Sequence, residues 1–311
     1  MANLPSQIIK ITRPLHWIKN LSLFAAILFT GELYNPILFW KVFWAFIAFN
    51  FATSATYVFN DILDVKVDRL HPIKKNRPIA SGKMSIPVAI ALSLGLSLAS
   101  LYLAVNLNSL FFFMVLSYLA IQILYSLGLK KVPIVDILII AFGFIMRVYS
   151  GAFVIDAHLS VWFLLCVISV ALFLASGKRR AELNIIQKTT VVTRESLTKY
   201  DTELLNSFVT MFGSAAWLSW SLFSFFESPT ASTPLWLLLS EISKTTTINK
   251  LMMITIPIVI FGIMRYQSLI FRGKSEAPEK VLLTDKSLVI SVLLWLGLVI
   301  FVLYGGIAAD F

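Results

Sequence analysis

The chain has 311 residues, of which 58% are hydrophobic and only 14% are charged. This composition excludes an ordinary soluble protein, and its repeated apolar runs of about 20 residues predict membrane-spanning helices. The net charge of +10 suits anionic lipid head groups, whereas nucleic acid is not an expected partner because the sequence has no soluble basic domain. The single cysteine, Cys166, lies in an apolar run, so we expect neither a disulfide framework nor a zinc site.

Nine apolar runs predict an all-α, polytopic membrane protein whose residues 1–311 form one domain. Most of the 26 Lys and Arg fall at the N-terminus and after the even-numbered runs, and positively charged loops stay in the cytoplasm. We therefore expect an integral protein of the inner (cytoplasmic) membrane, with its N-terminus in the cytoplasm and its C-terminus outside. The helices do not indicate an oligomeric state. The expected spans lie near 15–31, 37–59, 86–105, 110–128, 134–155, 160–177, 204–226, 250–270 and 287–306.

An acidic motif, NDILDVKVD at 60–68, follows the second span directly. It places Asp61, Asp64 and Asp68 at offsets of three and four, so on a helix they share one face. Neighbouring carboxylates repel one another unless a cation joins them, and hard oxygen ligands of this kind suit Mg²⁺. Mg²⁺ typically combines one or two carboxylates with substrate phosphates, so the motif indicates a diphosphate site at the cytoplasmic face.

Basic residues follow these acids in the same loop, among them Lys74 and Arg77. A solvated connector on the cytoplasmic side would also be basic. The preference for positive charge in cytoplasmic loops does not, however, explain why acids occur there. A metal that bridges the acids to a diphosphate, with Lys and Arg on the remaining phosphate oxygens, explains both signs of charge.

The connection after the fourth span contributes further candidates. Tyr125 and Lys130 lie at the membrane surface, and Asp136 begins the fifth span, where an acid needs a partner or a cavity. Lys130 is a candidate partner for Asp136. Arg147 lies deeper in the same span, where both structural pairing and substrate contact remain open.

Two more basic clusters lie at the expected cytoplasmic surface. Lys19 lies about one turn inside the first span, where snorkelling to the interface is the ordinary explanation. Lys178, Arg179 and Arg180 follow the sixth span in the segment SGKRRAEL. Each residue alone could be a membrane anchor, but Arg in particular suits bidentate recognition of phosphate.

These features together resemble the UbiA prenyltransferase superfamily, whose members have nine membrane helices and an NDxxDxxxD motif after the second. Residues 60–68 match all four fixed positions, and the resemblance extends over the whole chain. Ordinary members carry a second aspartate-rich motif after helix 6, whereas this chain has GKRRAEL at 177–183. That departure, together with the segments at 13–20, 64–82, 125–152 and 276–285, resembles the decaprenyl-phosphate phosphoribosyltransferase branch.

The resemblance implies transfer of 5-phosphoribose from 5-phosphoribosyl 1-diphosphate to a polyprenyl phosphate, for synthesis of a cell-envelope glycan. It implies that Mg²⁺ is the cofactor, held by Asn60, Asp61, Asp64 and Asp68. Catalytic roles would fall to the three aspartates and Lys130. The residues expected to bind substrate are Lys19, Asn60, Lys74, Arg77, Tyr125, Asp136, Lys178, Arg179 and Arg180.

Two other functions remain open from the sequence. An aromatic prenyltransferase of the same superfamily would use the same first motif, but the basic segment at 177–183 counts against it. A lipid transporter without catalysis is disfavoured because the acids gather at one membrane face and not at the midplane, where transporter sites tend to lie.

Overall fold

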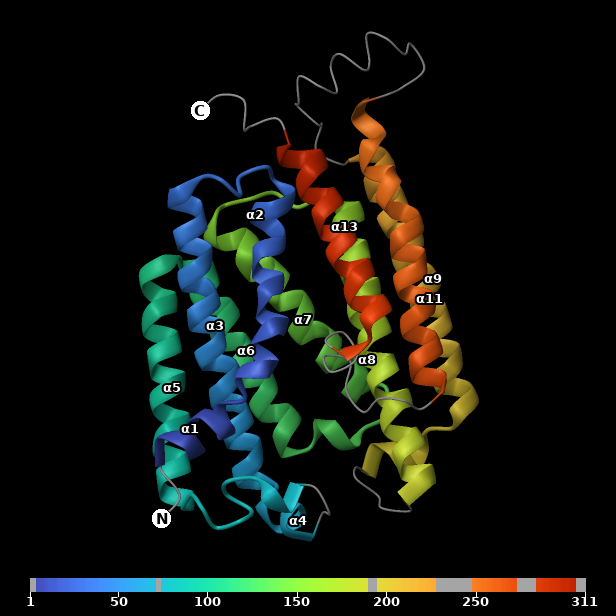
Figure 1. The fold of residues 1–311 in the computed structure, drawn as a ribbon. Helices are drawn as coiled ribbons and strands as arrows, with labels where there is room; N and C mark the ends of the chain where they lie inside the picture. The colour runs from blue at the N-terminus through green and yellow to red at the C-terminus, as the bar shows by residue number, and fades with distance from the viewer. Residues whose placement is uncertain (1–3, 71–73, 190–194, 228–247, 273–283, 306–311) are drawn as a thin grey trace. The chain divides into compact units, whose positions relative to one another are not determined.

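The computed structural model describes residues 4–70, 74–189, 195–227, 248–272 and 284–305, and within these ranges it contains helices and no strands (Figure 1). Eight helices are long and apolar enough to cross a membrane, so the multi-pass, all-α fold is confirmed. They are α3 (Pro36–Leu63), α5 (Ile86–Leu107), α6 (Ser109–Leu127), α7 (Val135–Val154), α8 (Val161–Thr189), α9 (Thr202–Phe226), the 3₁₀ helix η5 (Ile248–Thr255) continued by α11 (Ile256–Phe271), and α13 (Lys286–Tyr304).

The first expected span, 15–31, has a different form. A 3₁₀ helix, η1 (Pro14–Phe24), is followed by the short helix α2 (Ala25–Phe29). 3₁₀ helices longer than three or four residues are uncommon because their hydrogen-bond geometry is poorer, so the 11 residues of η1 need support from their neighbours. The count of nine spans stays a prediction, since the segment Pro14–Phe29 is shorter than the eight others.

The chain divides into two compact units. The first comprises Met1–Ala25, Pro36–Ala157 and Thr193–Ser196, and the second comprises Ala26–Asn35, His158–Val192 and Leu197–Phe311. That residues 1–311 make one membrane domain stays a prediction.

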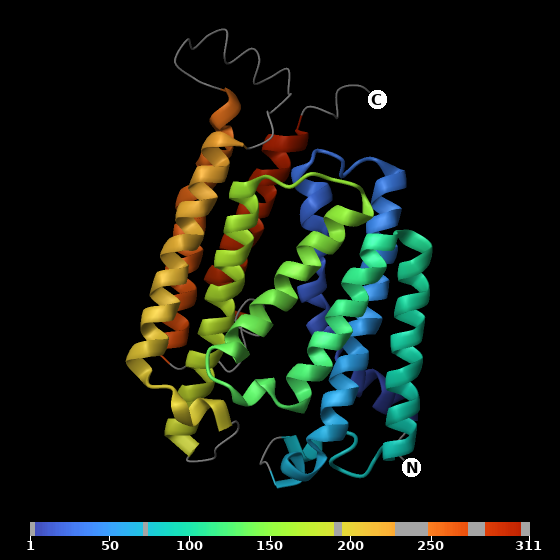
Figure 2. The ribbon, with the colours of Figure 1, turned by 180° about the vertical axis from the view of Figure 1, so that it is seen from behind.

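In the first unit, α3 packs against η1, α5, α6 and α7, and Figures 1 and 2 show α5 lying beside it. Small residues at Ala48, Ala52 and Ala55 of α3 are buried, which lets neighbouring helices approach closely. Two serines of α5 form hydrogen bonds to backbone carbonyls of α3. Ser93 donates to the carbonyl of Ala55 at 2.9 Å, and Ser100 donates to that of Ala48 at 2.7 Å.

A buried polar network fixes η1 inside the first unit. Arg147 of α7 donates through Nε to Asn20 Oδ1 at 2.6 Å and through Nη2 to the Tyr118 hydroxyl at 2.9 Å, and it also bonds the carbonyl of Gly143. Asn20 in turn donates to Asn50 Oδ1 of α3 at 2.6 Å. The structure therefore pairs Arg147 with neutral oxygens inside the first unit. Contact of Arg147 with substrate, the other alternative from the sequence, is not tested by these bonds.

Short elements complete the first unit at the end of α3. They are α1 (Leu4–Thr12), α4 (Val65–Leu70), and the 3₁₀ turns η2 (Lys74–Asn76) and η3 (Leu129–Lys131). Ile11 of α1 is buried in one cluster with Val58 of α3 and with Ile79 and Met84 of the loop before α5. This packing fastens the loop that carries Arg77 to the end of α3.

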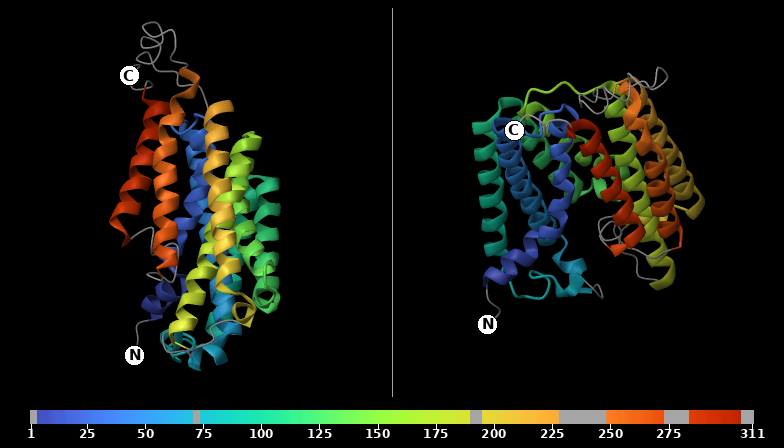
Figure 3. Two further views of the ribbon diagram at one scale, coloured as in Figure 1. Left: turned by 90° about the vertical axis from the view of Figure 1, so that its right-hand side faces the viewer. Right: turned by 45° about the horizontal axis from the view of Figure 1, so that its top comes forward.

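In the second unit, α8 packs against α9, and α9 and α11 lie side by side (Figure 3). The 3₁₀ turn η4 (Glu195–Lys199), of which the last three residues belong to this unit, precedes α9. An aromatic cluster around Phe29 includes Phe163, Trp220, Phe223 and Trp295, with ring centroids 4.9–6.4 Å from that of Phe29. Such packing of large rings is typical of a helix core.

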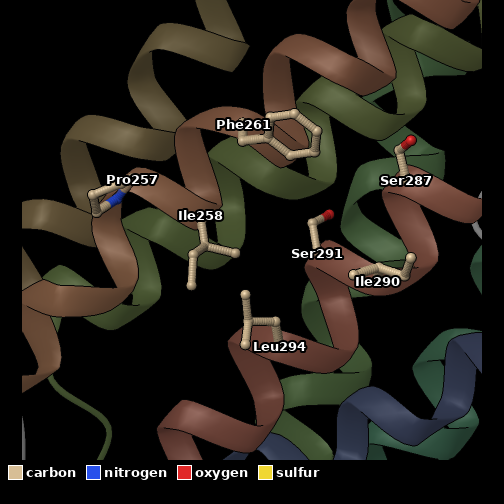
Figure 4. A pocket seen from close by; sticks show the side chains of 7 residues that line it. All are labelled: Pro257, Ile258, Phe261, Ser287, Ile290, Ser291 and Leu294. Atoms are coloured by element: carbon tan, nitrogen blue, oxygen red, sulfur yellow. The ribbon is translucent and has the colours of Figure 1, made fainter.

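A shallow hollow of about 410 Å³ lies between α11 and α13 of this unit (Figure 4). Two serine hydroxyls are its only polar side chains, and none of the seven described residues that line it is charged. The hollow therefore lacks the cations that a phosphate site requires. Its lining residues are Pro257, Ile258, Phe261, Ser287, Ile290, Ser291 and Leu294.

We predict that Gly151→Ala destabilises the protein by at least about 1–3 kcal/mol, the usual cost of overpacking. A Cβ at Gly151 of α7 would lie 1.9 Å from the carbonyl oxygen of Leu23 in η1, a backbone atom that cannot turn away. Thermal unfolding in detergent measures the effect. Gly95→Ala in α5 is the matched control, because a Cβ there meets nothing within 4 Å and we expect no loss of stability. Equal melting temperatures for the two variants would contradict the prediction.

Candidate active site

The acidic motif lies where α3 ends and α4 begins. Asn60 and Asp61 belong to the last turn of α3, Asp64 follows that helix, and Asp68 lies in α4. Helical hydrogen bonds continue across the junction, from the Asp64 amide to the Asn60 carbonyl at 2.9 Å and from the Asp68 amide to the Asp64 carbonyl at 2.8 Å. The expected helical spacing is therefore present, and each carboxylate follows the previous one by about one turn.

Asp61 and Asp68 converge on one guanidinium. Nη1 of Arg77 donates to Asp61 Oδ1 at 2.9 Å and to Asp68 Oδ2 at 2.6 Å. Both aspartates are buried, with residue exposures of 2%. A buried carboxylate is costly unless it is paired, so Arg77 compensates two such charges with one cation.

Asp64 is half-buried and pairs with a different cation. The ammonium of Lys130, in η3, donates to Asp64 Oδ1 at 2.7 Å and to Asn60 Oδ1 at 3.3 Å. The amide nitrogen of Asn60 donates to the other oxygen of Asp64 at 2.9 Å. The structure thus joins Lys130 to Asp64 of the acidic motif, whereas the sequence had suggested Asp136 as its partner.

Arg13 is a site residue that the sequence analysis did not select. Its Nη2 lies 2.5 Å from Asp61 Oδ1, and its guanidinium lies 4.9 Å above the ring of Tyr57. Its backbone has φ of 53°, which is uncommon for a residue other than glycine. The pair Arg13-Pro14 at the start of an apolar run was the available signal, but in a sequence it looks like an ordinary membrane-flanking cation.

Burial raises the pKa of the Asp68 carboxyl above its ordinary value. Arg77, through its charge and its hydrogen bond, and Lys74, through its charge, act in the opposite direction but do not outweigh the burial. Asp68 therefore needs compensating positive charge to stay ionised. Lys74 in η2 supplies part of it. Its expected contact with a phosphate of the substrate stays a prediction.

The donor atoms at this site fit Mg²⁺, which prefers carboxylate, amide and phosphate oxygens. Among the described residues, however, no three His, Cys, Asp or Glu side chains are grouped as a ready-made metal site. Arg77 forms ion pairs with Asp61 and Asp68, and Lys130 forms an ion pair with Asp64. The motif thus offers suitable ligands that are occupied by basic side chains.

The remaining expected residues of the first unit occupy different surroundings. Tyr125 is half-buried in α6, and Lys19 is half-buried in η1. Asp136, at the start of α7, is fully buried and accepts a hydrogen bond from the Ser196 hydroxyl at 3.1 Å. Asp136 therefore anchors the beginning of α7.

The basic residues Lys178, Arg179 and Arg180 lie in α8 of the second unit. The two arginines form hydrogen bonds and an ion pair within that unit. Arg179 is fully buried, and its Nη1 lies 2.5 Å from Glu182 Oε2. Arg180 donates through Nε to Asn206 Oδ1 at 2.6 Å and also bonds Asn184. Lys178 is half-buried. Phosphate binding by these three residues stays a prediction.

The fold and the acidic motif define a multi-pass helical membrane protein in which acidic and basic side chains form ion pairs at the end of a membrane-spanning helix. The model of the UbiA prenyltransferase family matches residues 21–244, so the chain belongs to that family.

Relatives with similar sequences match almost the whole chain. The decaprenyl-phosphate phosphoribosyltransferase of Corynebacterium glutamicum is 34% identical, over 97% of this chain and 88% of its own length. The protein of that name from Mycolicibacterium smegmatis is 36% identical, over 95% of this chain and 92% of its own length. Residues 276–283, part of the segment at 276–285 that resembles this branch, lie outside the described residues.

Solved structures share the fold at low sequence identity. A UbiA homologue from Archaeoglobus fulgidus, bound to DMAPP and Mg²⁺, has a TM-score of 0.66 at 16% identity and covers 96% of this chain and 99% of its own. The same homologue bound to GPP and Mg²⁺ gives a TM-score of 0.65. At this identity the likeness establishes the fold alone.

We predict that Arg77→Gln lowers the free energy of unfolding by about 1–3 kcal/mol, because it removes a cation shared by two buried carboxylates. Thermal or denaturant unfolding in detergent measures the loss. Arg69→Gln is the matched control, since Arg69 is exposed on α4, and adding Asp68→Asn to Arg77→Gln is expected to restore part of the stability. If Arg77→Gln were as stable as Arg69→Gln, the pairing would not contribute to stability.

Proposed function

We propose that this protein transfers 5-phosphoribose from 5-phosphoribosyl 1-diphosphate to a polyprenyl phosphate and releases diphosphate. The observation that carries the proposal is the likeness, over at least 95% of the chain, to two proteins named decaprenyl-phosphate phosphoribosyltransferase. The absence of a second aspartate-rich motif at 177–183 agrees with it, because the chain has Lys178, Arg179 and Arg180 there. An aromatic prenyltransferase and a transporter are not favoured.

This reaction requires little proton transfer by the protein. The bond between C1 of the ribose and the diphosphate oxygen breaks, and a bond from C1 to an oxygen of the acceptor phosphate forms. The acceptor is already an anion, so no strong general base is needed. The protein's contribution is then positioning and stabilisation of charge on the leaving diphosphate.

The acidic motif is proposed to hold Mg²⁺ through Asn60, Asp61, Asp64 and Asp68. When bound, this ion would neutralise negative charge on the diphosphate. The carboxylates are proposed to orient the donor through this ion, and their partners in the structure are cations of the type that phosphate oxygens require.

Lys130 and Arg77 are proposed to exchange carboxylate partners for phosphate oxygens of the donor. The contacts of its ammonium with Asp64 and Asn60 in the acidic motif support this role for Lys130. Lys74 and Arg13 supply further positive charge near Asp68 and Asp61. Tyr125 is proposed to orient the donor, and Asp136 is retained as a candidate for a ribose hydroxyl.

The remaining basic residues are proposed for the other two phosphate groups of the reaction. Lys19 of the first unit and Lys178, Arg179 and Arg180 of the second would serve the 5-phosphate or the phosphate of the lipid acceptor. Positive loops favour a site on the cytoplasmic side of the inner membrane, with the N-terminus inside and the C-terminus outside. The lipid product would enter the synthesis of a cell-envelope glycan.

The purified protein, incubated with donor labelled in the ribose, Mg²⁺ and a polyprenyl phosphate, is expected to yield a labelled lipid. The same mixture with a labelled prenyl diphosphate and an aromatic acceptor is the comparison. Label incorporated only from the prenyl diphosphate would overturn the proposed function. Fusion of a reporter to each terminus measures the proposed orientation separately.

We predict that Asp64→Asn reduces Mg²⁺-dependent turnover by about 100-fold or more, as expected when a charge-stabilising group is removed. The protein should remain folded, because Asp64 is half-buried and the Asn side chain can still bond Asn60. Turnover in the labelled-donor assay and the melting temperature in detergent are both measured. Asp156→Asn is the matched control, because Asp156 is exposed at the other end of α7. Full activity of Asp64→Asn would refute the metal assignment.

A further inference from the structure

The 3₁₀ helix η1 has three faces with different surroundings. Because a 3₁₀ helix has three residues per turn, side chains at every third position lie above one another. One face is buried and contains Asn20 and Leu23, both 0% exposed. A second face is apolar and exposed, with Leu15, Ile18 and Leu21 at 76%, 38% and 50% exposure. Burial along η1 therefore repeats every three residues, as this helix type requires.

The third face is polar, and we call it the polar face of η1. It begins at the N-cap residue Arg13 and continues with His16, Lys19 and Ser22, all of them half-buried. Its first two residues meet the same ring, since the Arg13 guanidinium lies 4.9 Å and the His16 ring 5.1 Å from the centre of Tyr57. The Ser22 hydroxyl donates to the carbonyl of Lys19 at 2.8 Å, which joins the last two.

The 3₁₀ form brings these side chains onto one face. At three residues per turn, Arg13, His16 and Lys19 lie in one row. In an α-helix each residue turns by about 100°, so Lys19 would lie about 120° away from Arg13 around the axis. It would instead share a face with Leu15, four residues earlier. The helix type therefore decides which side chains accompany Lys19.

The polar face starts at the acidic motif and extends away from it along η1. Arg13 forms an ion pair with Asp61. With a rise of about 2.0 Å per residue, Lys19 lies about 12 Å further along the helix axis. The sequence of α3 before Asp61 contains no acid, and its side chains that bond the buried face of η1 include the neutral Ser54 and Asn50. Positive charge on η1 thus continues past the carboxylates of the motif.

Snorkelling of Lys19 to the membrane interface does not explain this pattern. A lysine that serves only as an anchor suits a helix face that meets lipid. The exposed face of η1 is apolar, and the basic residues share the half-buried face instead. Basic side chains within an apolar segment that face inward typically line a polar cavity or a substrate pathway. Three of them in one row suit an anionic ligand.

We infer that the polar face of η1 binds the phosphate of the lipid acceptor, with Lys19 and His16 as its donors. Ammonium and imidazole N–H groups suit the oxygens of a phosphate monoester. A polyprenyl phosphate has an anionic head and an apolar tail, so it meets the polar face and the adjoining apolar face of η1 together. The 5-phosphate of a soluble sugar has no tail for that apolar face. The inference rests on the proposed function and separates Lys19 from the basic residues of α8.

Binding of farnesyl phosphate to the full-length protein in detergent, measured by titration calorimetry, tests the inference, with farnesol as the uncharged analogue. Lys19→Leu is expected to weaken farnesyl phosphate binding about ten-fold, as for loss of one charge-assisted hydrogen bond, and to leave farnesol binding unchanged. His16→Ala is expected to weaken it about three-fold. Lys19→Arg should recover most of the affinity, and its melting temperature should equal that of the wild type.

A relocated lysine tests the three-residue repeat. In the Lys19→Leu background, Leu15→Lys restores the charge at a position that shares a face with residue 19 only in an α-helix. We expect no recovery of farnesyl phosphate affinity, because in the 3₁₀ helix residue 15 belongs to the exposed apolar face. Recovery to the wild-type affinity would overturn the inference.

Three further results would contradict the assignment to the acceptor. They are wild-type affinity for farnesyl phosphate in Lys19→Leu, an equal loss of farnesol binding, and weaker binding of ribose 5-phosphate with farnesyl phosphate unaffected. The last result would give the polar face to the donor.

The titration also separates this inference from the proposed function. A wild-type protein that prefers farnesyl phosphate to farnesol but transfers no labelled phosphoribose would refute the proposed reaction and leave the inference standing. A wild-type protein without that preference would overturn the inference, whereas the labelled-donor assay would still decide the reaction.

Discussion

The organisation of the first unit depends on the neutralisation of three aspartates at the end of α3. Charged carboxylates in a region of low dielectric are costly, and here each one has a cation. The cations come from separate segments: Arg13 precedes η1, Arg77 lies in the loop before α5, and Lys130 lies between α6 and α7. The same ion pairs that compensate the acids therefore hold four segments of the chain together.

This arrangement connects stability with chemistry. The acids suit a divalent cation, and the bases that occupy them suit phosphate, so a metal-bound diphosphate would satisfy both sets at once. The site has little need of a proton-transferring residue, because an anionic acceptor is already a nucleophile. Positive φ values occur at one of the three cations, Arg13, and at Ile134, four residues after Lys130.

The apolar runs predicted the helices well, because a membrane span must bury its backbone in a helix and show an apolar surface. The first span was the exception. The pair Arg13-Pro14 precedes the first apolar run and the polar Asn20 lies within it, but this local pattern does not predict a 3₁₀ helix. That helix packs against α7 at Gly151, and Arg147 bonds its Asn20. Sequence periodicity does not report contacts between segments that lie more than a hundred residues apart.

The sequence by itself determined the membrane class, the helical fold and the aspartate-rich motif, because composition and local spacing suffice for these. The tertiary structure decided which cation pairs with which acid. Lys130 forms an ion pair with Asp64, Arg13 forms one with Asp61, and the buried Arg179 forms one with Glu182. It also showed the positive φ at Ile134, which is rare and strained for a β-branched residue. Ion pairing and backbone strain depend on distances between segments remote in the chain, and such distances exist only once the helices have packed.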